Sequence, residues 1–154
     1  MSEHFSEEEL SHSEYAIRHD LWNKPDKESL ENLERLAEQV LEPIRKEITR
    51  PIYITSGYRT KEINSSVGGS PNSQHMKGQA VDTVCPGVPL LQYYNRIKRM
   101  VALNELIVDQ VIFEFGNWVH ISYISSHNRN EFLIATKRSG QTVYMSDSIL
   151  PENP

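Results

Sequence analysis

A histidine and an aspartate lie at the end of a loop that is rich in small polar residues. His75 closes this loop, and Asp82 follows seven residues later. If residues 78–84 form a strand, Gly78, Ala80 and Asp82 share one face, and the two small residues leave space beside the carboxylate. An imidazole nitrogen and a carboxylate oxygen are ligands that borderline divalent metals accept. Such a pair also occurs by chance, so it does not define a metal site alone.

A second histidine adds to this pattern. His120 lies in an otherwise apolar run that follows Gly116 and Asn117. The simpler interpretation is a core histidine that is hydrogen-bonded to the backbone. The alternative is a third metal ligand, because three protein ligands and one open position are typical of catalytic zinc, which activates water and polarises a carbonyl.

Two helices are predicted to support these residues. The first covers residues 26–48, where Asp26 after Pro25 is a start signal. Its apolar positions recur at steps of three and four residues, namely Leu30, Leu33, Ala37, Val40, Leu41, Ile44 and Ile48. A second helix is expected from Pro89 to about Leu103, with one side formed by Leu90, Tyr94, Ile97 and Val101.

The remaining chain has the pattern of strands and loops. Short β-rich runs occupy residues 51–55, 78–84, 107–115, 118–124, 131–136 and 141–145. Tight turns between consecutive runs favour an antiparallel sheet, and the two helices then pack on one side of it. The sequence therefore predicts an α+β fold. The loop at residues 64–77 is long for a compact domain, and such loops are more often functional than idle.

Composition limits the classes of function. The 154 residues, of which 38% are hydrophobic and 24% charged, predict a single folded domain over residues 1–154. No apolar run approaches the roughly 18 residues of a membrane helix, so no membrane partner is expected. The lone Cys85 excludes an internal disulfide and a Cys-based zinc finger, and we expect it to be buried.

Charge argues against nucleic acid as a partner. Residues 1–50 carry 13 acids against 7 bases. The only local basic cluster, Arg96, Lys98 and Arg99, is expected to be the solvated face of a helix rather than a phosphate-binding surface.

Three motifs together resemble a known family. They are the run from Ser73 to Asp82 with His75, Gly78 and Ala80 inside it, the triplet Trp118, Val119 and His120, and the run Ser56, Gly57, Tyr58 and Arg59. This combination resembles the zinc D-alanyl-D-alanine carboxypeptidases and related peptidoglycan peptidases, including phage endolysins. The similarity covers about residues 5–124 and implies a hedgehog/D-Ala-D-Ala peptidase-like fold.

The resemblance also implies roles for residues. His75, Asp82 and His120 would ligate one Zn²⁺ per chain. Arg59 would contact the substrate carbonyl or carboxylate, as a bidentate donor suits either group. Ser73 would support a ligand or touch the substrate, with simple capping of the loop as the alternative. Trp118 would either wall the site or fill the core.

The catalytic base departs from the usual family pattern. Many relatives place an acid three residues before the last histidine, where this chain has Asn117. Glu114 is therefore the expected base, at the spacing found in the hedgehog signalling domains. A two-residue turn would place Glu114 and His120 on opposite faces, so we predict a three-residue loop or a bulge that puts Glu114 directly across from His120. Asp109 is the alternative acid, although a turn residue at a strand edge is the simpler interpretation.

The expected function is a zinc metallopeptidase that cleaves a stem-peptide amide in peptidoglycan, as a carboxypeptidase or an endolysin-type endopeptidase of phage or prophage origin. Residues 1–10 lack the order of a secretory signal. We therefore expect synthesis in the cytoplasm and action on the wall after release or as part of a virion. The alternative is a catalytically silent zinc-binding module, such as a phage tail component, and Asn117 favours it.

Overall fold

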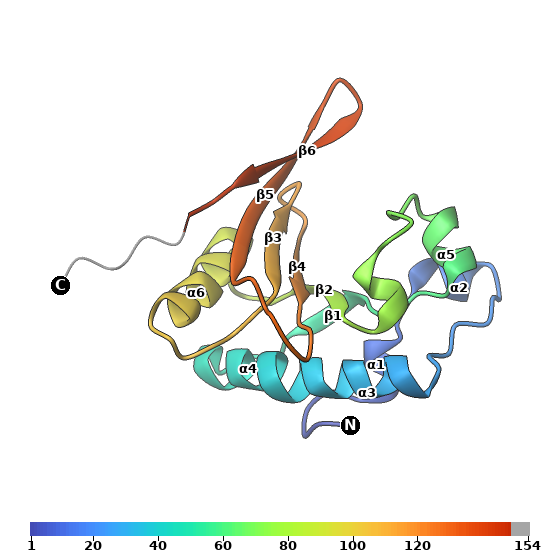
Figure 1. The fold of residues 1–154 in the computed structure, drawn as a ribbon, viewed down its shortest axis with the longest axis horizontal. Coiled ribbons are helices and arrows are strands. Elements are labelled where there is room, and N and C mark those ends of the chain that lie inside the picture. Colours follow the sequence, from blue (N-terminus) through green and yellow to red (C-terminus); the bar gives the residue numbers. More distant parts are fainter. Residues whose placement is uncertain (149–154) are drawn as a thin grey trace.

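The computed structural model describes residues 1–148, so residues 149–154 of the predicted domain lie outside the described part. Its helical elements are α1 (Glu7–Leu10), α2 (Glu14–Arg18), α3 (Lys27–Leu36), η1 (Ala37–Leu41), α4 (Glu42–Ile48), α5 (Lys61–Ser66), η2 (Gln74–Lys77) and α6 (Leu90–Ala102). Its strands are β1 (Tyr53–Ser56), β2 (Ala80–Val84), β3 (Gln110–Glu114), β4 (Trp118–Ser122), β5 (Glu131–Arg138) and β6 (Gln141–Ser146). Figure 1 shows their arrangement.

The predicted helix at residues 26–48 is confirmed as the continuous rod of α3, η1 and α4 (Figure 1). Asp26 caps it, since its Oδ1 accepts a hydrogen bond from the Ser29 backbone N–H at 2.8 Å. The middle section, η1, is a π-turn in which the Glu42 N–H bonds to the Ala37 carbonyl. Pro43 follows at once and has no N–H to donate, which explains why the regular α pattern is interrupted here.

The six strands form one sheet in the order β1-β2-β4-β3-β5-β6. Neighbouring strands are antiparallel except for β3 and β5, which are parallel. The expectation of an antiparallel sheet is therefore wrong for this pair. The reason is that β4 already lies between β2 and β3, so the chain after β4 crosses to the free side of β3 and there runs in the same direction as β3.

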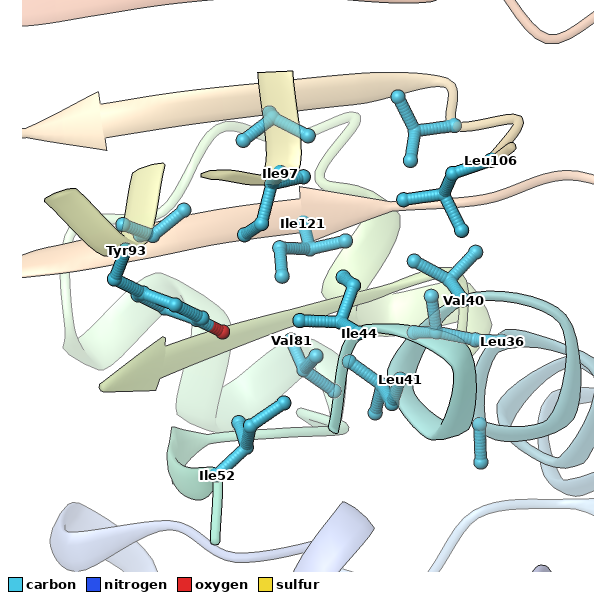
Figure 2. Close-up of a cluster of buried hydrophobic side chains, with 14 of the residues drawn as sticks. Leu36, Val40, Leu41, Ile44, Ile52, Val81, Tyr93, Ile97, Leu106 and Ile121 are labelled. Carbon is cyan, nitrogen blue, oxygen red and sulfur yellow. The ribbon is translucent and has the colours of Figure 1, made fainter. Parts of the chain in front are cut away.

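The two long helical units cover one face of the sheet. Val81 and Ile121 point from this face into a buried cluster with residues of α3, η1, α4 and α6 (Figure 2), and Val119 is buried in the same cluster. Cys85 is a free, buried thiol in the same cluster, as expected. This arrangement confirms the predicted α+β fold class. Side chains alternate along each strand, so the neighbours of these core residues point to the opposite face of the sheet.

Helix α6 presents more of its surface to the core than its sequence pattern indicates. Tyr94, Ile97 and Val101 are buried as expected, and Tyr93 and Met100 are buried beside them. The Tyr93 hydroxyl is satisfied by Thr83 Oγ1 at 2.7 Å. Within residues 1–148, no helix has the length and apolar character needed to cross a membrane.

Candidate active site

Three separate elements bring His75, Asp82 and His120 together on the face of the sheet that the long helices leave uncovered. The Nε2 of His75 lies 3.4 Å from the Oδ1 of Asp82, and the Nδ1 of His120 lies 3.0 Å from the same oxygen. One ligand atom from each residue lies within 4.8 Å of the others. The imidazoles of His75 and His120 thus converge on one carboxylate.

The sheet register explains the position of two of these groups. Strands β2 and β4 pair so that Asp82 is directly opposite His120. Directly opposed residues have Cβ atoms about 4.5–5.5 Å apart, which brings their side chains into reach of each other.

A tight turn places the third group. His75 lies on η2, which ends at Gly78 with a left-handed φ of 68°. A Cβ at position 78 would collide with the backbone carbonyl of Ser29 in α3, so only glycine permits this close approach. The first long helix therefore fixes the segment that carries His75.

The donor set fits a zinc ion. The carbonyl of Gly57 accepts a hydrogen bond from His75 Nδ1 at 2.8 Å, and a carbonyl can only accept, so the lone pair of His75 is on Nε2, which faces Asp82. Ligand atoms around a tetrahedral zinc ion are about 3.3–3.5 Å apart, given bonds of about 2.0–2.2 Å. The distances from the two histidines to Asp82, 3.4 and 3.0 Å, are close to this range, and all three ligand atoms lie within 4.8 Å of one another. Two imidazoles and one carboxylate leave a fourth position for solvent or substrate.

The hairpin between β3 and β4 delivers Glu114 to the same face. Its loop has the predicted three residues, with positive φ at Phe115 and Gly116. The expectation that Glu114 pairs directly with His120 is wrong, because Glu114 pairs with Trp118 and His120 pairs with Ile112. Glu114 instead reaches His120 diagonally, with its Oε1 3.7 Å from the Nδ1. The three-residue loop sets this offset. It pairs the last residue of β3 with the first residue of β4, so the residue opposite His120 lies two positions before Glu114.

The electrostatics of the site separate its two acids. Burial opposes ionisation of Asp82, but the charges and hydrogen bonds of His75 and His120 outweigh it and hold the pKa of Asp82 far below its usual range. Burial and the charge of Asp82 raise the pKa of Glu114, with His120 and Arg59 opposing this shift in part. One acid is thus suited to remain an anionic ligand, and the other to exchange a proton.

Arg59 lies against the ligands. Its Nη2 is 3.3 Å from the Oδ2 of Asp82, its Nε donates to Ser56 Oγ, and its Nη1 donates to Asn64 Oδ1. The guanidinium therefore holds the Asp82 oxygen that points away from the histidines. Arg59 also lines the cleft, with 14% of its side chain exposed.

The other two predicted site residues lie at the rim. The Ser73 hydroxyl accepts a hydrogen bond from the His75 backbone N–H at 3.3 Å, so it caps η2 while lining the cleft. Trp118 also lines the cleft and packs edge-on against Phe115, with ring centroids 5.8 Å apart. It walls the site rather than filling the core.

Asp109 does not face the cleft. It is buried, with 1% of its surface exposed, and the Nε and Nη2 of Arg129 hold its carboxylate at 2.9 and 2.8 Å. Gln74 donates to the same carboxylate at 2.9 Å. Asp109 therefore joins η2 to the start of β3 and is not placed to act as a base.

A cleft of about 890 Å³ opens over these groups. Besides the predicted residues, its walls include Ile112, Leu133, Lys137, Thr142 and Tyr144. The last four belong to β5 and β6, beyond the region in which the motifs resemble a known family. The sequence offers one signal for these four residues, which is the alternation of side chains between the two faces of a strand. This alternation does not show which of the two faces borders the site.

Comparison with known proteins now gives the family. The family model for peptidase M15 matches residues 3–122. The chain belongs to the peptidase M15 family. This match contains the three ligand candidates, Glu114 and Arg59, and it leaves the hairpin of β5 and β6 outside. Membership, together with the His75, Asp82 and His120 cluster, assigns this M15 peptidase to the metallopeptidases. A comparison with curated proteins gives no match.

Proposed function

We propose that this chain is a zinc-dependent peptidase that hydrolyses an amide bond in the stem peptides of peptidoglycan. It would act as a D-Ala-D-Ala carboxypeptidase or as an endolysin-type endopeptidase, encoded by a phage or prophage. It would reach the wall after release from the cytoplasm or on a virion. The observation that carries the peptidase proposal is the position of Glu114, 3.7 Å from a ligand histidine in a cleft that can hold a peptide. The choice of peptidoglycan and the phage origin come from the resemblance of the motifs.

The residues divide the chemistry between them. A zinc ion held by His75, Asp82 and His120 would supply a Lewis acid that activates water and polarises the scissile carbonyl. Glu114 accepts the proton of the attacking water and passes it to the nitrogen of the departing amine. Its raised pKa suits both transfers, since a base whose pKa lies closer to neutrality can also act as an acid.

Arg59 has two effects in this scheme. It fixes Asp82 through the 3.3 Å contact, which keeps the other carboxylate oxygen turned toward the histidines. Its positive charge at the cleft also stabilises the negative charge that develops on the carbonyl oxygen.

Replacing Glu114 by glutamine tests the mechanism. Glu114→Gln keeps the shape of the side chain but cannot take a proton, so we expect zinc to remain bound at one ion per chain while turnover falls about 10²- to 10⁴-fold. Mass spectrometry of products from defined muropeptides measures the turnover, and metal analysis measures the zinc. Glu62→Gln, at an exposed position on α5, is the matched control and should leave both values unchanged. Full activity in Glu114→Gln would remove Glu114 from the mechanism.

A second candidate function is a silent zinc-binding module that serves in assembly. Asn117 favours it, because this residue stands where many relatives carry the acid and cannot accept a proton from water. Wild-type protein with one zinc ion per chain and no amine release from purified peptidoglycan would select this candidate over the peptidase.

A further inference from the structure

The β5–β6 hairpin forms one wall of the cleft, although it lies outside the region that matches the family model. Ala135 of β5 pairs with Glu114 on one side and with Tyr144 of β6 on the other. Tyr144 therefore lies on the same face as Glu114, two strands away. Figure 1 shows that the hairpin extends beyond the turn between β3 and β4. Lys137 and Thr142 pair in this extension, on the cleft side.

Lys137 differs from the other cations of the cleft. Arg59 faces the carboxylate of Asp82, and Arg129 is bound to Asp109. Within residues 1–148, Lys137 makes no ion pair. Its Nζ instead donates to Thr142 Oγ1 at 2.9 Å and lies 5.2 Å from the centre of the Phe115 ring. Its charge therefore lies at the exposed edge of the cleft wall and is not neutralised by an acid among the described residues.

Two hydroxyl side chains of β6, Thr142 and Tyr144, lie on the same face of the hairpin as this charge. Thr142 uses an oxygen lone pair toward Lys137, so its own proton is free to be donated. Tyr144 is 56% exposed, and the partial burial of its hydroxyl, together with the negative charges of Glu114 and Asp82, raises its pKa, so the phenol also stays protonated and able to donate. An ammonium group hydrogen-bonded to one hydroxyl, with a second hydroxyl side chain on the next same-face pair of the hairpin, offers the donors that a carboxylate prefers.

We infer that Lys137, with Thr142 and Tyr144, forms a subsite for a carboxylate of the peptide substrate, at the wall of the cleft built by the β5–β6 hairpin. This inference rests on the proposed function for the identity of the substrate as a peptide. The carboxylate is either the C-terminal group of that peptide or an acidic group along it, and the experiment distinguishes these two sources.

The test measures binding of synthetic stem peptides to the zinc-loaded full chain in the Glu114→Gln background, by titration calorimetry. Three peptides are compared: the free-acid form, a form with only the C-terminal carboxylate amidated, and a form with only the other carboxylates amidated. We expect Lys137→Met to weaken binding of the free-acid form about threefold to tenfold, as for a partly exposed charge-assisted hydrogen bond. One of the two amidated forms should bind Lys137→Met and the parent equally, and that form identifies the carboxylate.

Two further variants are controls. Arg138→Met removes the adjacent cation, whose side chain points to the opposite face of β5, and should change no binding constant. Lys137→Arg keeps the charge and should retain most of the preference for the acid form.

The inference is overturned if Lys137→Met weakens all three peptides equally, if the parent binds acid and amidated forms equally, or if no form binds. Binding with the expected preference but no amine release from the wild-type chain would support the subsite and reject the hydrolytic function. Amine release by the wild-type chain, with peptide binding that does not depend on Lys137, would support the hydrolytic function and reject the subsite.

Discussion

Asp82 is the residue that the site depends on most at the scale of single side chains. One of its oxygens lies within 3.4 Å of both imidazoles, and the other contacts Arg59 at 3.3 Å. Three cationic or potentially cationic groups therefore surround one buried carboxylate. A divalent cation bound in such a cluster would be ligated by the imidazole nitrogens and the carboxylate oxygen, in place of the hydrogen bonds between them. Because the unfolded chain does not hold these ligands together, binding of the cation would stabilise the folded state.

Removal of one ligand should abolish this gain. For the wild-type chain at a free zinc concentration about 100 times the Kd, we expect about 2.7 kcal/mol of stabilisation, which raises the Tm by about 5–10 °C in a chain of this size. His120→Ala should show no rise in Tm on addition of zinc, as measured by scanning calorimetry with and without a chelator. His19→Ala changes an exposed histidine that is not part of the cluster and should keep the full rise. An undiminished rise in His120→Ala would mean that zinc binds elsewhere.

At the scale of elements, the buried carboxylate of Asp109 connects the segment that carries His75 to the sheet. Asp109 precedes β3, Gln74 begins η2, and Arg129 lies in the connection before β5. Burial opposes ionisation of Asp109, but hydrogen bonds from Arg129 and Gln74 outweigh it and hold the pKa of Asp109 below its usual value of 3.8. The ionised carboxylate therefore stabilises the folded chain.

Asp109→Asn should lower the free energy of unfolding by about 2–3 kcal/mol at pH 7, less than for a fully buried ion pair because Arg129 is half exposed. Because the pKa of Asp109 is lower in the folded chain than in the unfolded chain, its ionised form stabilises the wild type fully at pH values above the unfolded pKa of 3.8. This stabilisation is lost as the pH falls through the lower pKa of the folded chain. Urea unfolding at pH 7 and near pH 3 measures both effects. Asp20→Asn, at an exposed position, should match the wild type throughout. A deficit of unchanged size near pH 3 would exclude ionisation as its cause.

Elements with a strong local pattern were predictable, and the pairing of distant elements was not. The helix at residues 26–48 follows from its apolar period and from Asp26 as a cap, both of which are local. The odd loop after Glu114 followed from the requirement that an acid and His120 share a face. The parallel pairing of β3 with β5 could not be derived, because it depends on which side of β3 is free once β4 has docked. The bridge from Asp109 to Arg129 is equally non-local, as nothing in the chain between them specifies the pair.

At the scale of the whole molecule, the core continues past the family match. Phe132 of β5 is buried against Tyr94 of α6, with ring centroids 5.7 Å apart. The Tyr94 hydroxyl donates to Asp147 after β6 at 2.7 Å, and Lys98 contacts the same carboxylate at 3.0 Å. The last two strands therefore share one core with the rest of the sheet, and we expect them to unfold together with it.

Phe132→Ala should therefore destabilise the entire domain by about 3–5 kcal/mol, because it leaves a cavity between β5 and α6. Denaturant unfolding should show one transition at a lower midpoint, whether it is followed by tryptophan fluorescence near the site or by far-ultraviolet circular dichroism. Met145→Ala, at an exposed position on β6, should change the stability by less than about 0.5 kcal/mol. Two separate transitions in Phe132→Ala would contradict a single cooperative unit.

The three candidate ligands lie on two kinds of element, and we expect a kinetic consequence. Asp82 and His120 lie on β2 and β4, both of which have a strand on each side, whereas His75 lies on the single turn η2. Deuterium uptake should be slowest at the amides of the two interior strands and much faster in residues 73–78. If so, a metal ion held by these residues would enter and leave through opening of the His75 turn, which breaks its contacts with Gly57 and Asp109, while the sheet stays closed.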